Sequence, residues 1–492
     1  MELRHVHIVC LARALSLRAS HGAAVLLVLL LLRAVMAGLL PLSADEAYYW
    51  LWSKHLAAGY LDHPPAIAWI IRAGTSLLGN APFGVRFGGV VLSGAATWAV
   101  WESARILLKD EARALTAALL FNLSLMINVE MLAATPDMPS IATSAAFLYC
   151  LVRLQQSGEG KYWLWAGLAA GLSLLSKYSA LFLIAGAFFW LLLSPRARTW
   201  LKTPWPWCGA LLALGVFLPN LWWQSSHDWE TFAFQFSRVA GHQITARFIA
   251  EFIAAQFGLA SPFIFILGVA GLARARRDSD LFLPAMLTWP AVVYFFIHAL
   301  HDRVQGNWPA FLYPAFAILA ASVFADTGWR KWCVRLAAPV AALFLLTSYA
   351  QALTGIIPLG ARDPLARLLG TGFKPVAEGL ADAARRSSAG VVLTTDYEST
   401  AWLAWYQPGL KLVQMGELWR YPDAPMADQA LMAHPLLYFV EQKRDQSAEI
   451  RKYFSDVSLA GELKIDRKGA ELARYRIYLV AGPKTPMPGR MP

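Results

Sequence analysis

The sequence has 492 residues, of which 57% are hydrophobic and only 15% are charged, and its mean hydropathy is +0.45. Soluble domains carry about 25% charged residues, so this composition excludes an ordinary soluble protein and predicts a polytopic membrane protein. The net charge of +11 does not indicate nucleic-acid binding, because Lys and Arg occur in short clusters between apolar segments. The four cysteines are widely spaced, which argues against a disulfide framework or a cysteine-rich metal site.

Long apolar runs dominate the first two thirds of the chain. About 20 apolar residues cross a bilayer as a helix, and the first run is long enough to be a retained span rather than a cleaved signal peptide. The pattern predicts eleven transmembrane helices, near residues 22–41, 83–104, 114–130, 138–153, 162–177, 179–193, 207–223, 249–272, 281–299, 309–326 and 334–352.

The distribution of Lys and Arg between the loops predicts the orientation of these spans. One set of span ends carries most of the basic residues and the opposite set far fewer, and the richer ends face the cytoplasm. With an odd number of spans, the N-terminus is then cytoplasmic, and the C-terminus and the first loop, residues 43–80, lie outside.

Residues 353–492 differ in character from residues 1–352. Short apolar runs at 391–393, 436–440 and 475–480 alternate with polar stretches that are compatible with helices. This pattern predicts a small α/β domain outside the membrane, and the final residues GPKTPMPGRMP are expected to be disordered.

The first outward loop contains most of the candidate chemistry, in SADEAYYWLWSKHLAAGYLDHPP. Ser43 and Glu46 fit a capping box that opens a helix, so Glu46 has a structural explanation. Tyr48 and Trp52 recur at helical spacing and suit an aromatic face along the bilayer interface. Neither feature explains Asp45, or the second acidic cluster at Asp62, and a carboxylate beside a bilayer is costly unless it pairs, faces water or does chemistry.

Two further charged residues stand out in apolar surroundings. Asp137 lies between two prolines at the start of a predicted span, where it can do chemistry or cap the helix, a role that Thr135 could also fill. Lys177 lies between two apolar runs and either extends to the interface or pairs with an anion, for which the headgroup phosphate of a lipid is the expected partner.

Two later outward regions combine aromatic and polar side chains. The first contains Arg238, and the second contains Trp308 together with His298, His301 and Asp302. Aromatic rings beside polar groups suit carbohydrate and suit an interface belt equally well. The two histidines and the aspartate resemble metal ligands, but their spacing in a loop is weak evidence, so a divalent metal is possible and unsupported.

The motifs DEAYYWLWSKHLAAGYLDHPP, ATPDMP, GLSLLSKYSA, PNLWWQSSHDWETF and GNWPAFLYP occur in this order in bacterial membrane glycosyltransferases. The chain resembles the GT-C class that uses polyprenyl-phosphate sugars, which includes protein O-mannosyltransferases and the aminoarabinose transferase of lipid A. It is most similar to the branch of rhizobial lipopolysaccharide-core galacturonosyltransferases. In DHPP it has His63 where the aminoarabinose branch has a lysine.

The resemblance implies a location in the bacterial inner membrane, a polyprenyl-phosphate sugar donor, and an acceptor such as lipid A, lipopolysaccharide core or another envelope glycan. Its essential acid falls on Asp45, with Glu46 adjacent, and its lysine falls on Lys177. Because a phosphomonoester leaves readily, one base suffices for an inverting displacement, and Asp45 is the expected base. No cofactor is then required.

The expected transferase activity also assigns residues to binding of the donor phosphate and of the substrate. The residues expected to bind the donor phosphate are Lys177, His63 and Arg238, and those expected to bind substrate are Tyr48, Tyr49, Asp62, Asp137 and Trp308. A transporter or lipid flippase is the main alternative, but it predicts ionisable residues near mid-membrane and repeated halves, whereas here the ionisable residues gather at one face. A scaffold protein is the other alternative, and it leaves the outward motifs without a shared purpose.

Overall fold

The structure is a computed structural model, and it describes residues 2–237, 244–324, 327–416, 424–425 and 429–484. The chain divides into two compact units, and each is described by itself. The first unit comprises residues 1–38, 62–70 and 86–348, and the second comprises 39–61, 71–85 and 349–492.

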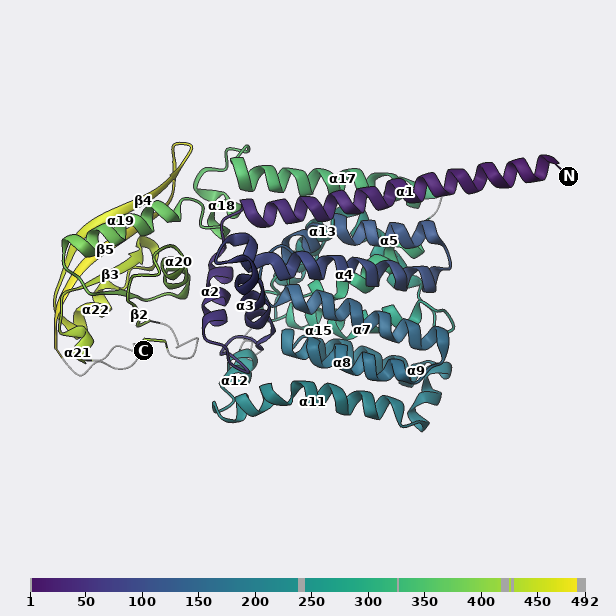
Figure 1. The fold of residues 1–492 in the computed structure, drawn as a ribbon, viewed down its shortest axis with the longest axis horizontal. Coiled ribbons are helices and arrows are strands. Elements are labelled where there is room, and N and C mark those ends of the chain that lie inside the picture. The colour runs from purple at the N-terminus through teal and green to yellow at the C-terminus, as the bar shows by residue number, and fades with distance from the viewer. Residues whose placement is uncertain (1, 238–243, 325–326, 417–423, 426–428, 485–492) are drawn as a thin grey trace. The chain divides into compact units, whose positions relative to one another are not determined.

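The described part of the first unit is built from helices. They are α1 (Glu2–Leu39), α4 (Pro82–Leu108), α5 (Glu111–Leu123), α6 (Leu125–Glu130), α7 (Asp137–Ser157), α8 (Lys161–Ser176), α9 (Ala180–Leu193), α10 (Pro195–Arg198), α11 (Trp205–Ser225), α12 (Glu230–Ser237), α13 (Arg247–Ala260), α14 (Pro262–Arg274), α15 (Phe282–His298), α16 (Tyr313–Ser322) and most of α17 (Gly328–Thr354), with 3₁₀ turns η1 (Thr199–Lys202) and η2 (Ala310–Leu312). Helices α7, α8 and α11 run side by side (Figure 1).

Glycines allow α8 and α11 to approach closely. A Cβ placed on Gly167 would lie 2.1 Å from the backbone oxygen of Gly209, and one placed on Gly209 would lie 2.4 Å from the backbone oxygen of Trp163. Small residues at helix contacts are typical of membrane proteins, where close packing of the helices replaces the hydrophobic effect.

The prediction of a multi-pass membrane protein is confirmed. Among the described residues, four helices are long and apolar enough to cross a membrane, namely His21–Leu39, Pro82–Leu108, Trp205–Ser225 and Gly328–Thr354. Two bent pairs, Ala180–Leu193 with Pro195–Lys202 and Arg247–Ala260 with Pro262–Arg274, raise this number to six if each pair is one span.

The prediction of one continuous helix over residues 249–272 is wrong. Helix α13 ends before Ser261, which has a φ of 73°, and α14 begins at Pro262 with its axis bent by 109°. Proline disfavours the helical conformation in the residue before it and has no N–H to donate. The predicted span at 114–130 is also interrupted, because Ser124 ends α5 and caps α6 through its hydroxyl.

The second unit combines short helices with a mixed five-stranded sheet. Its helices are α2 (Ala44–Lys54), the last part of α3 (Ala66–Leu78), α18 (Pro364–Leu368), α19 (Phe373–Arg386), α20 (Tyr397–Tyr406), α21 (Gln429–Met432) and α22 (Ser447–Tyr453), with 3₁₀ turns η3 (Gly360–Arg362) and η4 (Gln442–Arg444). Its strands are β1 (Val391–Thr394), β2 (Leu412–Gln414), β3 (Leu436–Glu441), β4 (Phe454–Arg467) and β5 (Ala470–Pro483).

The strand order is β2-β1-β3-β5-β4, in which β1 runs parallel to β2 and β3, and β5 runs antiparallel to β3 and β4. The predicted strands at 391–393, 436–440 and 475–480 are confirmed as β1, β3 and β5, whereas β2 and β4 were not predicted. Strand β5 extends to Pro483, so the expected disorder is wrong for Gly482 and Pro483, and residues 485–492 lie outside the described part of the chain.

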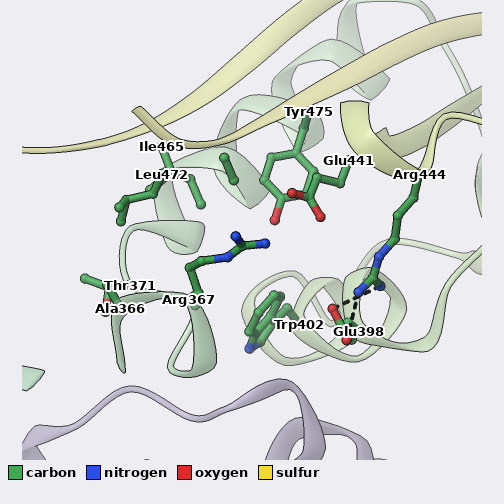
Figure 2. Close-up of a pocket in the computed structure, with 12 residues that line it drawn as sticks. Ala366, Arg367, Thr371, Glu398, Trp402, Glu441, Arg444, Ile465, Leu472 and Tyr475 are labelled. Carbon is green, nitrogen blue, oxygen red and sulfur yellow. Dashed lines mark hydrogen bonds and ion pairs between the residues drawn. The ribbon is translucent and has the colours of Figure 1, made fainter. Parts of the chain in front are cut away.

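A cavity of about 220 Å³ opens in this unit between the loop after α18, helix α20 and strand β5 (Figure 2). Its walls include the rings of Trp402 and Tyr475, and polar side chains from α18, α20 and β3 point toward it. Both aromatic residues are buried in the protein. The cavity is therefore lined by both aromatic and polar side chains.

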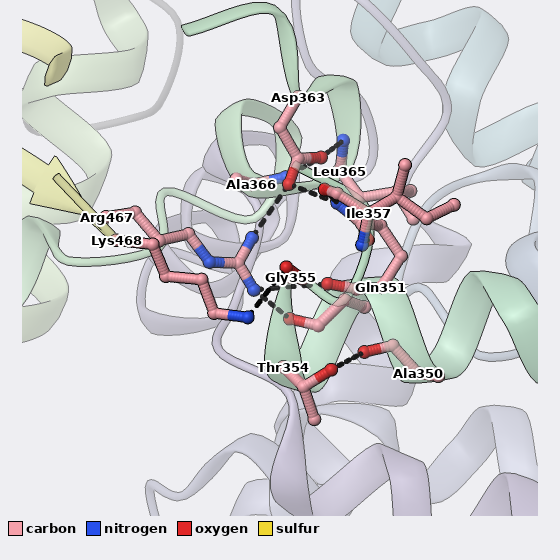
Figure 3. Close-up of polar contacts among 11 residues, drawn as sticks. Ala350, Gln351, Thr354, Gly355, Ile357, Asp363, Leu365, Ala366, Arg467 and Lys468 are labelled. Atoms are coloured by element: carbon pink, nitrogen blue, oxygen red, sulfur yellow. Dashed lines mark hydrogen bonds and ion pairs between the residues drawn. The ribbon is translucent and has the colours of Figure 1, made fainter. Parts of the chain in front are cut away.

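The hairpin of β4 and β5 is fastened to the last turn of α17 by Arg467 (Figure 3). Its guanidinium donates to Asp363 Oδ2 at 2.9 Å and to the backbone oxygens of Gln351 and Ala352 at 3.1 Å. The last carbonyls of a helix have no partner within the helix and carry partial negative charge. Arg467 satisfies two of them with one cation.

Candidate active site

Asp45 lies in the first turn of α2, and the predicted capping box is confirmed beside it. The backbone N–H of Glu46 donates to Ser43 Oγ at 3.2 Å, and the backbone N–H of Ser43 donates to Glu46 Oε2 at 2.9 Å. Glu46 is 1% exposed, whereas Asp45 is half-buried. The box directs Glu46 inward onto the backbone, and Asp45 is the acid of the pair that retains an accessible surface.

The carboxylate of Asp45 accepts a hydrogen bond from the hydroxyl of Tyr397, with Oη 3.0 Å from Oδ1. Tyr397 is the first residue of α20, whose N-cap is Asp396, and its ring packs against Tyr48 with centroids 5.3 Å apart. Trp402 of α20 also donates to the backbone oxygen of Leu42 at 3.0 Å. Two side chains of one helix thus fix the start of α2.

The aromatic residues of α2 face the protein interior, so the interface-belt interpretation of Tyr48 and Trp52 is wrong. Tyr48 is 3% exposed and Trp52 is fully buried, with its ring stacked on Tyr60 at 4.1 Å. Burial raises the pKa of Tyr60 to about 12, despite a hydrogen bond from the backbone of Ala57. Tyr49, at 7% exposed, is also buried.

The second acidic cluster, in residues 62–65, belongs to the first unit. Asp62 is 7% exposed, and its backbone oxygen accepts a hydrogen bond from Gln235 Nε2 at 2.7 Å. His63 is half-buried. Arg238, the third residue expected to bind the donor phosphate, lies outside the described residues.

Lys177 forms a buried ion pair with Asp137 in the first unit. Its Nζ lies 2.7 Å from Oδ1 and 2.8 Å from Oδ2 of Asp137, and the two side chains are 12% and 4% exposed. Asn307 Nδ2 also donates to Asp137 Oδ2, at 2.9 Å. The alternative in which Asp137 caps α7 is wrong, because Pro136 is the N-cap and no side chain caps this helix.

The ion pair leaves part of the lysine's hydrogen-bonding capacity unused by Asp137. An ammonium group has three N–H donors, and two of the contacts of Lys177 are with the same carboxylate. Lys177 is the C-cap residue of α8, and its backbone is in an extended conformation. An anion that accepts a hydrogen bond from the third N–H of the Lys177 ammonium would use its remaining donor.

Trp308 is half-buried and packs against His298, with ring centroids 5.3 Å apart. Its neighbour Asn307 contacts Asp137, so the GNWP segment reaches the Lys177 pair through the residue before Trp308. Among the described residues, no group of three or more His, Cys, Asp or Glu side chains is arranged to hold a metal ion. The requirement for a metal therefore stays untested.

Comparison with known proteins confirms the resemblance to polyprenyl-phosphate-dependent GT-C glycosyltransferases. Residues 62–223 match the family described as dolichyl-phosphate-mannose-protein mannosyltransferase. Over 296 residues the chain is 32% identical to the lipid A galacturonosyltransferase RgtD of Rhizobium johnstonii. This alignment covers 58% of the chain and 61% of the relative, so the chain spans about three fifths of that relative's length.

Among solved structures, the fold is similar to that of ArnT from Cupriavidus metallidurans. The structure of ArnT bound to undecaprenyl phosphate superposes with a TM-score of 0.64 at 16% identity, covering 94% of this chain and 99% of ArnT. Its apo structure gives a TM-score of 0.63, covering 96% and 100%. The similarity thus covers the helices and the C-terminal sheet together.

Proposed function

We propose that this chain, which has the fold of the GT-C transferase ArnT and resembles RgtD in sequence, is a membrane glycosyltransferase that uses a polyprenyl-phosphate sugar. The observation that carries the proposal is the 32% identity to a lipid A galacturonosyltransferase. It is supported by a fold similarity that covers 94% of the chain. Lipid A is the proposed acceptor, and the donor sugar is a uronic acid by analogy with RgtD.

The proposed reaction is an inverting displacement at the anomeric carbon. The oxygen of an acceptor hydroxyl forms a bond to this carbon, the bond from the carbon to the phosphate oxygen breaks, and polyprenyl phosphate leaves. Asp45 takes the hydroxyl proton as general base. Its support is its half-buried carboxylate, oriented by Tyr397 at 3.0 Å, beside a Glu46 that is committed to the helix cap.

Lys177 is proposed to bind the phosphate of the donor through its remaining donor. The support is its low exposure of 12% and the two contacts that fix its ammonium on Asp137. In this proposal Asp137 and Asn307 position the lysine, and the phosphate adds to the pair instead of displacing it. Preorganised cations stabilise charge that gathers on a leaving phosphate. The convergence of Lys177, His63 and Asp45 on one substrate stays a prediction.

The proposed topology follows the loop charges. In this proposal the N-terminus is cytoplasmic and the second unit is periplasmic. Orientation is tested by cysteine labelling of intact cells at position 435 in the loop before β3, with position 278 between α14 and α15 as the cytoplasmic control.

The experiment that tests the function is transfer by the purified protein. Wild-type protein is incubated with a polyprenyl-phosphate uronic acid and lipid A, and both released polyprenyl phosphate and modified lipid A are measured by mass spectrometry. We expect both products in equal amounts from the wild type and a trace from Asp45→Asn. Equal turnover by wild type and Asp45→Asn would contradict the assignment of Asp45 as the base. Hydrolysis of the donor without formation of modified lipid A would contradict lipid A as the acceptor.

A further inference from the structure

The cavity between α18, α20 and β5 has the chemistry of a second ligand site, separate from Asp45 and Lys177. Its volume of about 220 Å³ is below the 300–1,000 Å³ of pockets for drug-sized ligands, which limits the ligand to about one sugar ring. Trp402 and Tyr475 form apolar walls (Figure 2). Aromatic rings beside polar groups match the apolar faces and the hydroxyls of a sugar.

Two arginines line this cavity and differ in how they are paired. Arg444 is neutralised, since it lies 3.0 Å from Glu398 and 3.7 Å from Asp396. Arg367 forms no ion pair with any residue that the structure describes, and its guanidinium points into the cavity in Figure 2. Its planar fork of donors suits bidentate binding of a carboxylate or phosphate. The cavity therefore offers one uncommitted cation.

The remaining polar groups provide partners for hydroxyls. The hydroxyl of Thr371 is buried and has no hydrogen-bond partner within the described part of the chain. A buried polar group without a partner is destabilising unless a ligand or water satisfies it. The carboxylate of Glu441 also lines the cavity (Figure 2), and it forms no ion pair among the described residues. It is an acceptor for a sugar hydroxyl.

We propose that this cavity binds one anionic monosaccharide unit, a hexuronate, with its carboxylate on Arg367, its hydroxyls on Thr371 and Glu441, and its ring between Trp402 and Tyr475. A hexuronate carries a carboxylate that can pair with Arg367. A neutral hexose has no such group and would leave Arg367 without a counter-ion. The same chemistry is present in a free saccharide and in a sugar carried on a lipid.

The test is calorimetric titration of the full-length protein in detergent with galacturonate, with galactose as the neutral control. We expect galacturonate to bind more tightly than galactose, and Arg367→Gln to weaken galacturonate by about tenfold. Arg367→Lys retains the positive charge but lacks the planar guanidinium, so its affinity for galacturonate should lie between those of the wild type and Arg367→Gln. Thr371→Val, which preserves shape, should weaken both sugars. Arg362→Gln, outside the cavity in the neighbouring turn, should leave both unchanged.

The contrary outcomes are equally specific. Equal affinity of the wild-type protein for galacturonate and galactose would overturn the proposal. So would a loss of galacturonate affinity in Arg362→Gln as large as the loss in Arg367→Gln. The proposal also fails if folded wild-type protein, checked by its thermal midpoint, binds neither sugar. Loss of binding in Asp45→Asn would assign the sugar to the transfer site instead. Octyl galacturonide in the same micelles distinguishes the sources, because tighter binding than the free sugar, still dependent on Arg367, identifies a lipid-linked ligand.

Discussion

The hydroxyl of Tyr397 lies 3.0 Å from Oδ1 of Asp45, although 352 positions separate the two residues in the chain. The bond connects the first turn of α20 with the first turn of α2, and the ring of Tyr48 packs against the ring of Tyr397. The proposed base is thus oriented by the C-terminal part of the sequence.

Replacing Tyr397 by phenylalanine removes this hydrogen bond and preserves the ring. A donated hydrogen bond favours the ionised form of a carboxylate, so we expect slower transfer and a rate-against-pH profile whose acid limb moves to higher pH. The measurement is initial transfer rate between pH 5 and 9. Tyr453→Phe in α22 is the matched control, and identical profiles for the two variants would contradict a positioning role.

Replacing Asp45 and Glu46 separately by their amides distinguishes a role in catalysis from a role in helix capping. Asp45→Asn should lower the transfer rate by about 10²–10⁴-fold, the usual contribution of a general base. Glu46→Gln should retain most activity, because an amide oxygen still accepts the N–H of Ser43 in the capping box. Rates are normalised to folded protein by size-exclusion chromatography. A larger loss from Glu46→Gln than from Asp45→Asn would reverse the assignment.

Breaking the ion pair of Lys177 with Asp137 should destabilise the helices. The side chains are 12% and 4% exposed, and removal of one partner from a buried pair costs about 3–5 kcal/mol. We expect a lower thermal midpoint for both Lys177→Met and Asp137→Leu. The double variant should recover much of the midpoint without recovering transfer. Full transfer by the double variant would show that the pair is structural alone.

Arg467 should stabilise the second unit more than other arginines of the same hairpin. It contacts Asp363 and two carbonyls of α17 with 14% of its side chain exposed (Figure 3), so we expect Arg467→Ala to destabilise by about 3 kcal/mol. Faster proteolysis between α17 and α18 is the readout. Arg474→Ala, whose ion pairs with Glu462 and Glu471 lie at the surface, should have little effect.

Asp396 predicts a pH dependence of stability. Burial raises the pKa of this carboxyl above its ordinary value, although hydrogen bonds from Ser399 and the charge of Arg444 oppose the shift. A raised pKa stabilises the fold at low pH, and this contribution is lost as the pH rises through the folded-state pKa.

Asparagine also caps helices well, so Asp396→Asn should gain stability relative to wild type between pH 4 and pH 7. Thermal midpoints of both proteins across this range provide the measurement. A constant difference would mean that Asp396 titrates normally.

The positions of helices could be predicted from the sequence because long apolar runs and the Ser43 capping box are local signals. The break at Ser261 was missed because the hydropathy of residues 249–272 is continuous, and the signal was Pro262 alone. Strand β4 could not be predicted because charged residues interrupt its apolar ones. In the structure, Lys468 and Gly469 both have positive φ, which is typical of a tight hairpin turn.

Two pairings at the candidate sites had no local signal. Asp137 was expected to bind substrate and Lys177 a phosphate, yet the two side chains form an ion pair across 40 positions. The role of Tyr397 could not be predicted from the sequence, because nothing in its neighbourhood distinguishes it from other aromatic residues. Pairs of this kind depend on tertiary packing, which periodicity and composition do not encode.

The attachment of α2 to α20 has a consequence for engineering chimaeras. Tyr397 donates a hydrogen bond to Asp45, and Trp402 donates one to the backbone oxygen of Leu42. Replacing residues 349–492 by those of another transferase would exchange both side chains for ones that evolved beside a different first loop. A functional graft must therefore transplant residues 39–61 with the C-terminal segment, so that the acid and its tyrosine are inherited together.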